Sequence, residues 1–109
     1  MIDSMARKSQ QVEEKHRELV RQLEDRVRGQ YCITMREVPV RNPSTGQMIG
    51  EIDLVGIVDG MWDIYEVKVN DGFRKARRQL DNLKFYLRGY AQLRLYYYSG
   101  KDDEIVRVG

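Results

Sequence analysis

The chain has 109 residues, of which 41% are hydrophobic and 33% charged, with only two prolines. This length suits a single domain over residues 1–109, and the composition is that of a folded soluble protein, not of a disordered tail. One cysteine and one histidine exclude an internal disulfide and a Cys/His zinc or iron–sulfur cluster. Any bound metal is therefore expected to have oxygen ligands.

The longest uncharged apolar run, residues 54–58, is far shorter than the ~20 residues of a membrane-spanning helix. The polar N-terminal segment also lacks the apolar region of a signal peptide. We therefore expect a soluble, cytoplasmic protein with no membrane partner.

The formal net charge of +2 conceals two segments of opposite charge. Residues 51–66 contain five acids and no base, whereas residues 71–94 contain seven bases and two acids. The chain therefore carries a local negative field followed by a local positive one.

In chain order, apolar residues at spacings of three and four predict an amphipathic helix over 8–28, with Ser9 as its N-cap. A segment rich in β-branched and aromatic residues predicts a strand over 31–40, and turn formers connect it to a partner strand over 48–58. The dipeptide Asp59-Gly60 then predicts a tight turn into a third strand over 61–69.

A second amphipathic helix is expected from Phe73 to near Gly89, followed by short strands over 93–99 and 104–108. The order α-β-β-β-α-β-β predicts a mixed α/β fold in which helices pack on one mixed sheet.

The second and third strands carry the charged side chains of most interest. Because side chains alternate along a strand, Glu66 and Lys68 share one face of the third strand, and Asp53 shares a face of the second with Glu51. Neighbouring strands can thus bring Asp53, Glu66 and Lys68 together, and buried charges are costly unless they are paired or bind a metal. Glu66 and Lys68 alone would be an ordinary cross-strand pair. Glu51 is interpreted as a solvated strand-end acid, with a role near a metal left open.

Asp53, twelve intervening residues and then Glu66-x-Lys68, followed by a basic helix, resembles the PD-(D/E)xK nuclease superfamily. The segments Gly50–Gly56 and Tyr65–Lys68 are most similar to the archaeal Holliday-junction resolvase and RecB-like branches. Ile52 stands where the motif's name has proline, which many members lack. The resemblance implies a restriction-endonuclease-like α-β-β-β-α-β core, in agreement with the order predicted from periodicity.

The resemblance also implies roles for individual residues. Asp53 and Glu66 would bind Mg²⁺, or Mn²⁺ in its place, together with the carbonyl oxygen of Val67, since hard cations prefer oxygen ligands. Lys68 would orient or help to deprotonate the attacking water and offset charge on the scissile phosphate.

Members of this superfamily often take a further catalytic acid from the first helix. His16 stands where the resolvase pattern has glutamate, although a histidine on an apolar helical face is more often a core or boundary residue. We favour Glu13, which shares the face of His16, and Glu14 and Glu18 remain alternatives.

Gln79, eleven residues after Lys68, resembles the catalytic glutamine of RecB-like members, although Leu83 stands where those members have tyrosine. Four bases surround Gln79 and are predicted to bind DNA phosphates: Arg74, Lys75, Arg77 and Arg78. A merely solvated helix face is the alternative for these four bases.

The function expected from this resemblance is metal-dependent endonucleolytic hydrolysis of branched or structured DNA, as in recombination and repair. A homodimer is expected, because one site cuts one strand and a symmetric substrate requires two sites. The alternatives are a RecB-like exonuclease, a restriction-type endonuclease, and a non-catalytic nucleic-acid-binding or assembly module that retains the fold.

Overall fold

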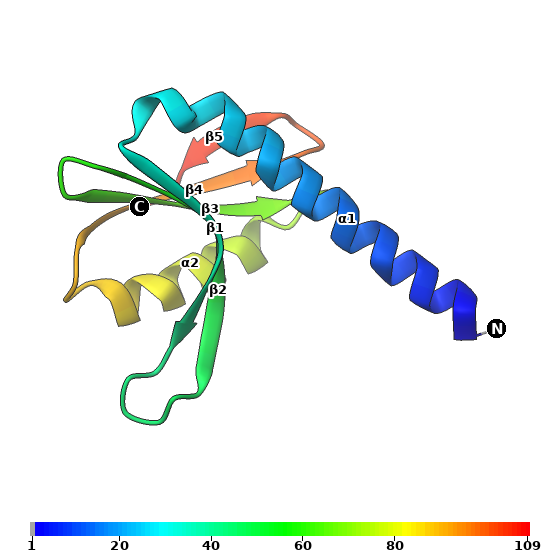
Figure 1. The fold of residues 1–109 in the computed structure, drawn as a ribbon, viewed down its shortest axis with the longest axis horizontal. Helices are drawn as coiled ribbons and strands as arrows, with labels where there is room; N and C mark the ends of the chain where they lie inside the picture. The colour runs from blue at the N-terminus through cyan, green and yellow to red at the C-terminus, as the bar shows by residue number, and fades with distance from the viewer. Residues whose placement is uncertain (1) are drawn as a thin grey trace.

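Two helices lie on opposite faces of a five-stranded sheet in the computed structural model, which describes residues 2–109 and the side chains of residues 10–109 (Figure 1). The elements in chain order are α1 (Ile2–Val27), the 3₁₀ helix η1 (Arg28–Gln30), β1 (Ile33–Arg41), β2 (Met48–Val58), β3 (Met61–Lys68), α2 (Phe73–Leu87), β4 (Gln92–Ser99) and β5 (Glu104–Arg107). The predicted order α-β-β-β-α-β-β and the predicted mixed sheet are confirmed.

The first helix is longer than the sequence pattern predicted. It begins at Ile2, so Ser9 lies inside α1 and the prediction of an N-cap there was wrong. Residues 2–8 contain no glycine or proline that would stop a helix, which is why it extends past the predicted start. Despite its 26 residues, α1 is not apolar enough to cross a bilayer, and within residues 2–109 no other helix is either.

The sheet has the strand order β1-β2-β3-β4-β5. The first three strands form an antiparallel meander, α2 provides the crossover between the parallel strands β3 and β4, and β5 returns antiparallel to β4. Each face of the sheet has its own apolar cluster. On the α1 side Val20 and Leu23 pack with Leu54, and on the α2 side Leu80 packs with Ile64.

The sheet divides between β2 and β3. Their pairing runs from Val58 opposite Met61 to Leu54 opposite Tyr65. Beyond that point β2 continues beside β1 alone, while β3 continues beside β4 as far as Lys68. The β1–β2 hairpin therefore separates from the other strands and extends past them, as Figure 1 shows. We call this opening between β2 and β3 the fork.

Candidate active site

Asp53 lies where the fork opens and is 6% exposed. Its Oδ2 accepts a hydrogen bond of 2.8 Å from the backbone N–H of Val67, so a side chain replaces the backbone acceptor that a continued ladder would supply. The same oxygen is 3.4 Å from Nε2 of His16 on α1. The Asp53 carboxylate is thus fixed by one strand and one helix that are distant from it in the sequence.

Glu66 is the second buried carboxylate of the fork, with 4% exposure. Burial, and then the negative charge of Asp53, raise the pKa of Glu66 to about 7. Lys68 lowers this pKa in part, because its Nζ lies 3.4 Å from Oε1 of Glu66. The structure therefore brings Asp53 and Glu66 close enough for their charges to repel. One ammonium group only partly relieves this repulsion.

Lys68 is held from the side of α2. Its Nζ donates a hydrogen bond of 2.9 Å to Oε1 of Gln79, so the predicted glutamine contacts the predicted lysine directly. A Cβ at Gly72 would lie 3.2 Å from Cγ of Lys68, and the glycine before α2 thus leaves room for the lysine stem. The amine remains partly accessible to solvent, which a group that meets a substrate phosphate requires.

His16 is the α1 residue that reaches the fork. Besides Asp53, its Nε2 faces the carbonyl oxygen of Val67 at 3.1 Å. Both neighbours are acceptors, so Nε2 carries a proton, and its N–H donates a hydrogen bond to the Val67 carbonyl. The interaction with Asp53 raises the pKa of His16, against the effect of burial.

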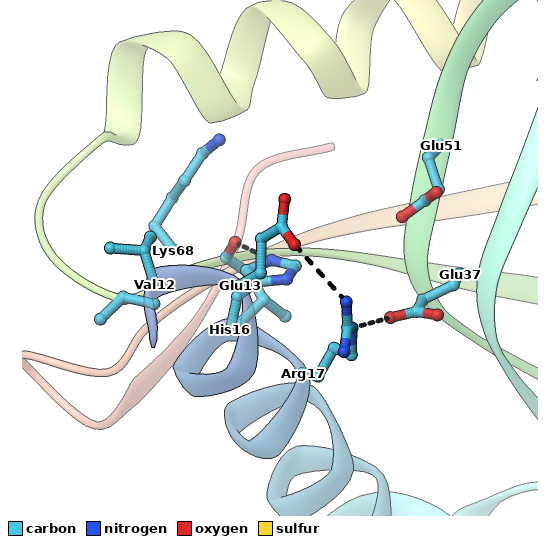
Figure 2. A pocket seen from close by; sticks show the side chains of 9 residues that line it. Val12, Glu13, His16, Arg17, Glu37, Glu51 and Lys68 are labelled. Atoms are coloured by element: carbon cyan, nitrogen blue, oxygen red, sulfur yellow. Dashed lines mark hydrogen bonds and ion pairs between the residues drawn. The ribbon is translucent and has the colours of Figure 1, made fainter. Parts of the chain in front are cut away.

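A cavity of about 540 Å³ opens beside the fork (Figure 2). Glu13, the favoured first-helix acid, lines this cavity, but the described structure pairs its carboxylate with Arg17 at 3.6 Å and not with the buried acids. Arg17 also lies 3.7 Å from Glu37 of β1, so it bridges two acids across the cavity. Glu13 is therefore near the site but is not joined to Asp53 and Glu66.

Further acids surround the same cavity. Glu51 lines it, and burial, followed by the charges of Asp53 and Glu37, raises the pKa of Glu51. Glu37 has a positive φ of 56° in the middle of β1. Arg17 and Glu37 were not among the predicted site residues. The spacing of four residues from Glu13 to Arg17 was an available signal, whereas the place of Glu37 depends on the pairing of β1 with β2.

The four predicted DNA-binding bases of α2 are exposed, and within residues 10–109 none has a carboxylate partner within 4.0 Å: Arg74, Lys75, Arg77 and Arg78. Arginines of α1 differ in this respect. Arg21 pairs with Glu18, and Arg26 pairs with Asp103 at 3.1 Å. Positive charge is therefore available for an anionic ligand on α2, whereas Arg17, Arg21 and Arg26 of α1 already have acidic partners.

The oxygen atoms of the fork suit a hard divalent cation. Asp53 and Glu66 supply carboxylates, and the Val67 carbonyl lies beside them, while waters can complete such a shell. Within the described part of the chain, no group of three or more His, Cys, Asp or Glu side chains is arranged to hold a metal. Two carboxylates and one backbone carbonyl form a smaller donor set than such a group.

Cys32 is exposed; it precedes the edge strand β1 and lies outside both apolar clusters.

Comparison of this chain with protein-family models and with curated proteins finds no match. The chemistry of the site therefore rests on its own residues.

Proposed function

We propose that this protein is a Mg²⁺-dependent endonuclease that hydrolyses phosphodiester bonds in branched or structured DNA. The observation that carries the proposal is that two carboxylates, Asp53 and Glu66, are buried at the fork, where the charge of Asp53 raises the pKa of Glu66 and the amine of Lys68 lies 3.4 Å from Glu66. Buried like charges destabilise a fold unless a counter-charge is present. A divalent cation would supply that charge where a phosphodiester can also reach.

Each side chain has a distinct role in this proposal. Asp53 and Glu66, with the Val67 carbonyl, would hold Mg²⁺, which when bound polarises a phosphoryl oxygen and lowers the pKa of a water ligand. Lys68, oriented by Gln79, holds the attacking water and offsets negative charge that develops on the scissile phosphate. His16 fixes the Val67 carbonyl through its Nε2–H, which is a positioning role.

The exposed bases of α2 supply the attraction for DNA. They lie on the helix that also carries Gln79, so a strand whose phosphates follow α2 passes close to Lys68. Replacing Arg77 and Arg78 by alanine should weaken DNA binding and reduce the slope of log affinity against log salt by about 2, because two phosphate contacts are lost.

The matched control for that variant is alanine at Arg21 and Arg26, two exposed arginines of α1 that already have acidic partners. Their replacement should leave the salt slope unchanged. Equal effects of the two double variants would show that α2 is not the DNA-binding surface.

The activity itself is tested with linear, nicked and four-way-junction DNA, each incubated with Mg²⁺, Mn²⁺ or EDTA. We expect cleavage of the junction at internal positions with either cation and none with EDTA. Binding without cleavage under every metal condition would instead identify a non-catalytic DNA-binding module.

A second candidate is an exonuclease of the RecB-like kind, which the hydrogen bond between Lys68 and Gln79 favours. Leu83 stands in place of that branch's tyrosine. It lies on the buried face of α2, against the sheet, and so does not face a substrate. Circular and linear DNA of the same sequence separate the two candidates, since an exonuclease degrades only the linear form.

The homodimer belongs to this proposal, because a four-way junction has two symmetric strands to cut and each chain has one fork. Sedimentation at micromolar concentration, with and without junction DNA, tests this part. A monomer under both conditions would contradict it.

A further inference from the structure

A second cavity, of about 530 Å³, lies between the β1–β2 hairpin and the C-terminal half of α2. Its walls are rich in rings: Trp62 on β3 and Tyr86 at the end of α2 face this space, together with Tyr90, Pro39 and Pro43. Among the described residues that line it there is no acid, and Arg41 is the one charged residue. The cavity beside the fork, in contrast, is lined by three glutamates.

Positive charge is also present at this ring-lined cavity. Arg41 lines it and has no carboxylate within 4.0 Å among residues 10–109. Apolar rings beside an arginine without an acidic partner match a ligand that has a flat aromatic part and an anionic backbone.

The ring-lined cavity is also close to the candidate active site along the chain. Ile52 lines it, and the next residue is Asp53 of the fork. On α2, Tyr86 follows Gln79 by seven residues, which is about 10 Å along a helix axis. That length corresponds to roughly three nucleotides at the rise of a duplex strand.

We propose that the ring-lined cavity binds an unpaired nucleobase of the DNA strand whose phosphates follow α2. This inference rests on the proposed function and names the feature of the substrate that the protein recognises. Bases inside a duplex are stacked and enter a cavity only if they are flipped out at a cost in unpairing and unstacking free energy, whereas single-stranded DNA and distorted branch points present bases at a lower cost. Stacking on tyrosine and tryptophan tolerates any base, so recognition would depend on DNA structure and not on sequence.

Trp62 is the single tryptophan of the chain, so its fluorescence reports directly on this cavity. In EDTA, which prevents cleavage, titration with a fluorescein-labelled oligothymidylate should quench Trp62, while the label's anisotropy reports binding independently. A blunt duplex of equal length should bind by anisotropy without the same quenching.

Tyr90→Ala removes a side chain that is 72% exposed, and its loss is not expected to disturb folding. It should weaken binding of the oligothymidylate about tenfold and leave duplex binding unchanged. Phe85→Ala is the matched control, since Phe85 is an exposed aromatic residue of α2 that does not line the cavity. It should bind both DNAs as the unmodified protein does.

Three outcomes would overturn the inference in different ways. Single-stranded DNA that binds with no quenching of Trp62, and equally well to Tyr90→Ala, would refute the base site and leave the proposed function intact. Absence of binding to any DNA would refute both proposals. Trp62 emission that depends on protein concentration without DNA would show that a second copy of the chain occupies the cavity.

Discussion

Two buried acids of β3 lie only three residues apart and have opposite surroundings. Asp63 is 3% exposed and is fully paired: Arg94 donates to both of its oxygens, at 2.6 and 2.9 Å, and the Tyr31 hydroxyl donates at 2.6 Å. Glu66 is equally buried, yet among the side chains of residues 10–109 the one cation within 4.0 Å of its carboxylate is Lys68, at 3.4 Å.

The difference separates a structural acid from a candidate functional one. Hydrogen bonds and an opposite charge compensate the burial of Asp63, so it joins the segment between η1 and β1 to β3 and β4. Glu66 lies near a second carboxylate instead. Its raised pKa shows that ionising it in the folded protein costs free energy, which Lys68 offsets only in part. Burial of an acid is therefore uninformative until its partners are counted.

The largest effect is expected for the acids of the fork. Asp53→Asn or Glu66→Gln should lower the rate of Mg²⁺-dependent cleavage roughly a thousandfold or more, because each removes a carboxylate ligand. DNA affinity in EDTA should remain unchanged, since α2 supplies the phosphate contacts. Glu104→Gln, at an exposed acid of β5, is the control, and cleavage by Asp53→Asn at the rate of that control would refute the site.

Loss of the structural acid should act on stability and not on chemistry. Asp63→Ala removes three hydrogen bonds and is expected to lower the free energy of unfolding by about 3 kcal/mol, measured by urea denaturation. Cleavage per folded molecule should persist at temperatures where the variant is folded. A stable Asp63→Ala variant without activity would show that Asp63 is needed for cleavage and not for folding.

The pH dependence of stability distinguishes Glu66 further. Because burial and Asp53 raise its pKa from 4.5 to about 7, the folded state binds the Glu66 proton more tightly than the unfolded chain does. The protein without metal should therefore lose stability as pH rises from about 4.5 through 7. Glu66→Gln, which stays neutral, should gain roughly 3 kcal/mol relative to the unmodified protein between pH 4 and 8. A pH-independent difference in urea denaturation would contradict this.

The smallest effect is expected at the edge of the Asp63 network. Tyr31→Phe removes the hydroxyl that contacts Asp63 and Tyr65 but keeps the ring, for which Gly56 leaves space. The free energy of unfolding should fall by about 1–2 kcal/mol, because the hydroxyl makes two hydrogen bonds and the phenol of Tyr65 and the Arg94 pair of Asp63 remain. Thermal denaturation measures this change, and a loss of several kcal/mol would mean that the hydroxyl organises the whole network.

Much of the fold followed from local patterns, because strong periodicity and turn residues mark the elements. The bounds predicted for the strand over 48–58 match β2, and Phe73 begins α2 as expected. The start of α1 was missed, since no residue there forces a boundary. Turn residues at 59–60 fix the register of β2 and β3 as far as Leu54 opposite Tyr65, so that Asp53 and Glu66 are the next residues, at the point where the pairing ends.

Contacts made by α1 could not be predicted in the same way. Whether His16 or Glu13 reaches the fork depends on the rotation of α1 on the sheet, which the packing of Val20 and Leu23 determines. The hydrogen bonds of Asp63 could not be predicted either, because its partners Tyr31 and Arg94 lie about thirty residues before and after it in the sequence.

The hydrogen bond from the Val67 amide to Asp53 gives the molecule an internal spectroscopic probe. An amide proton held by a charged oxygen in a closed site should exchange slowly with deuterium and resonate far downfield. Any cation or proton that withdraws electron density from that oxygen would shift the resonance, so one cross-peak in a nitrogen–proton spectrum would follow the occupancy of the fork in solution.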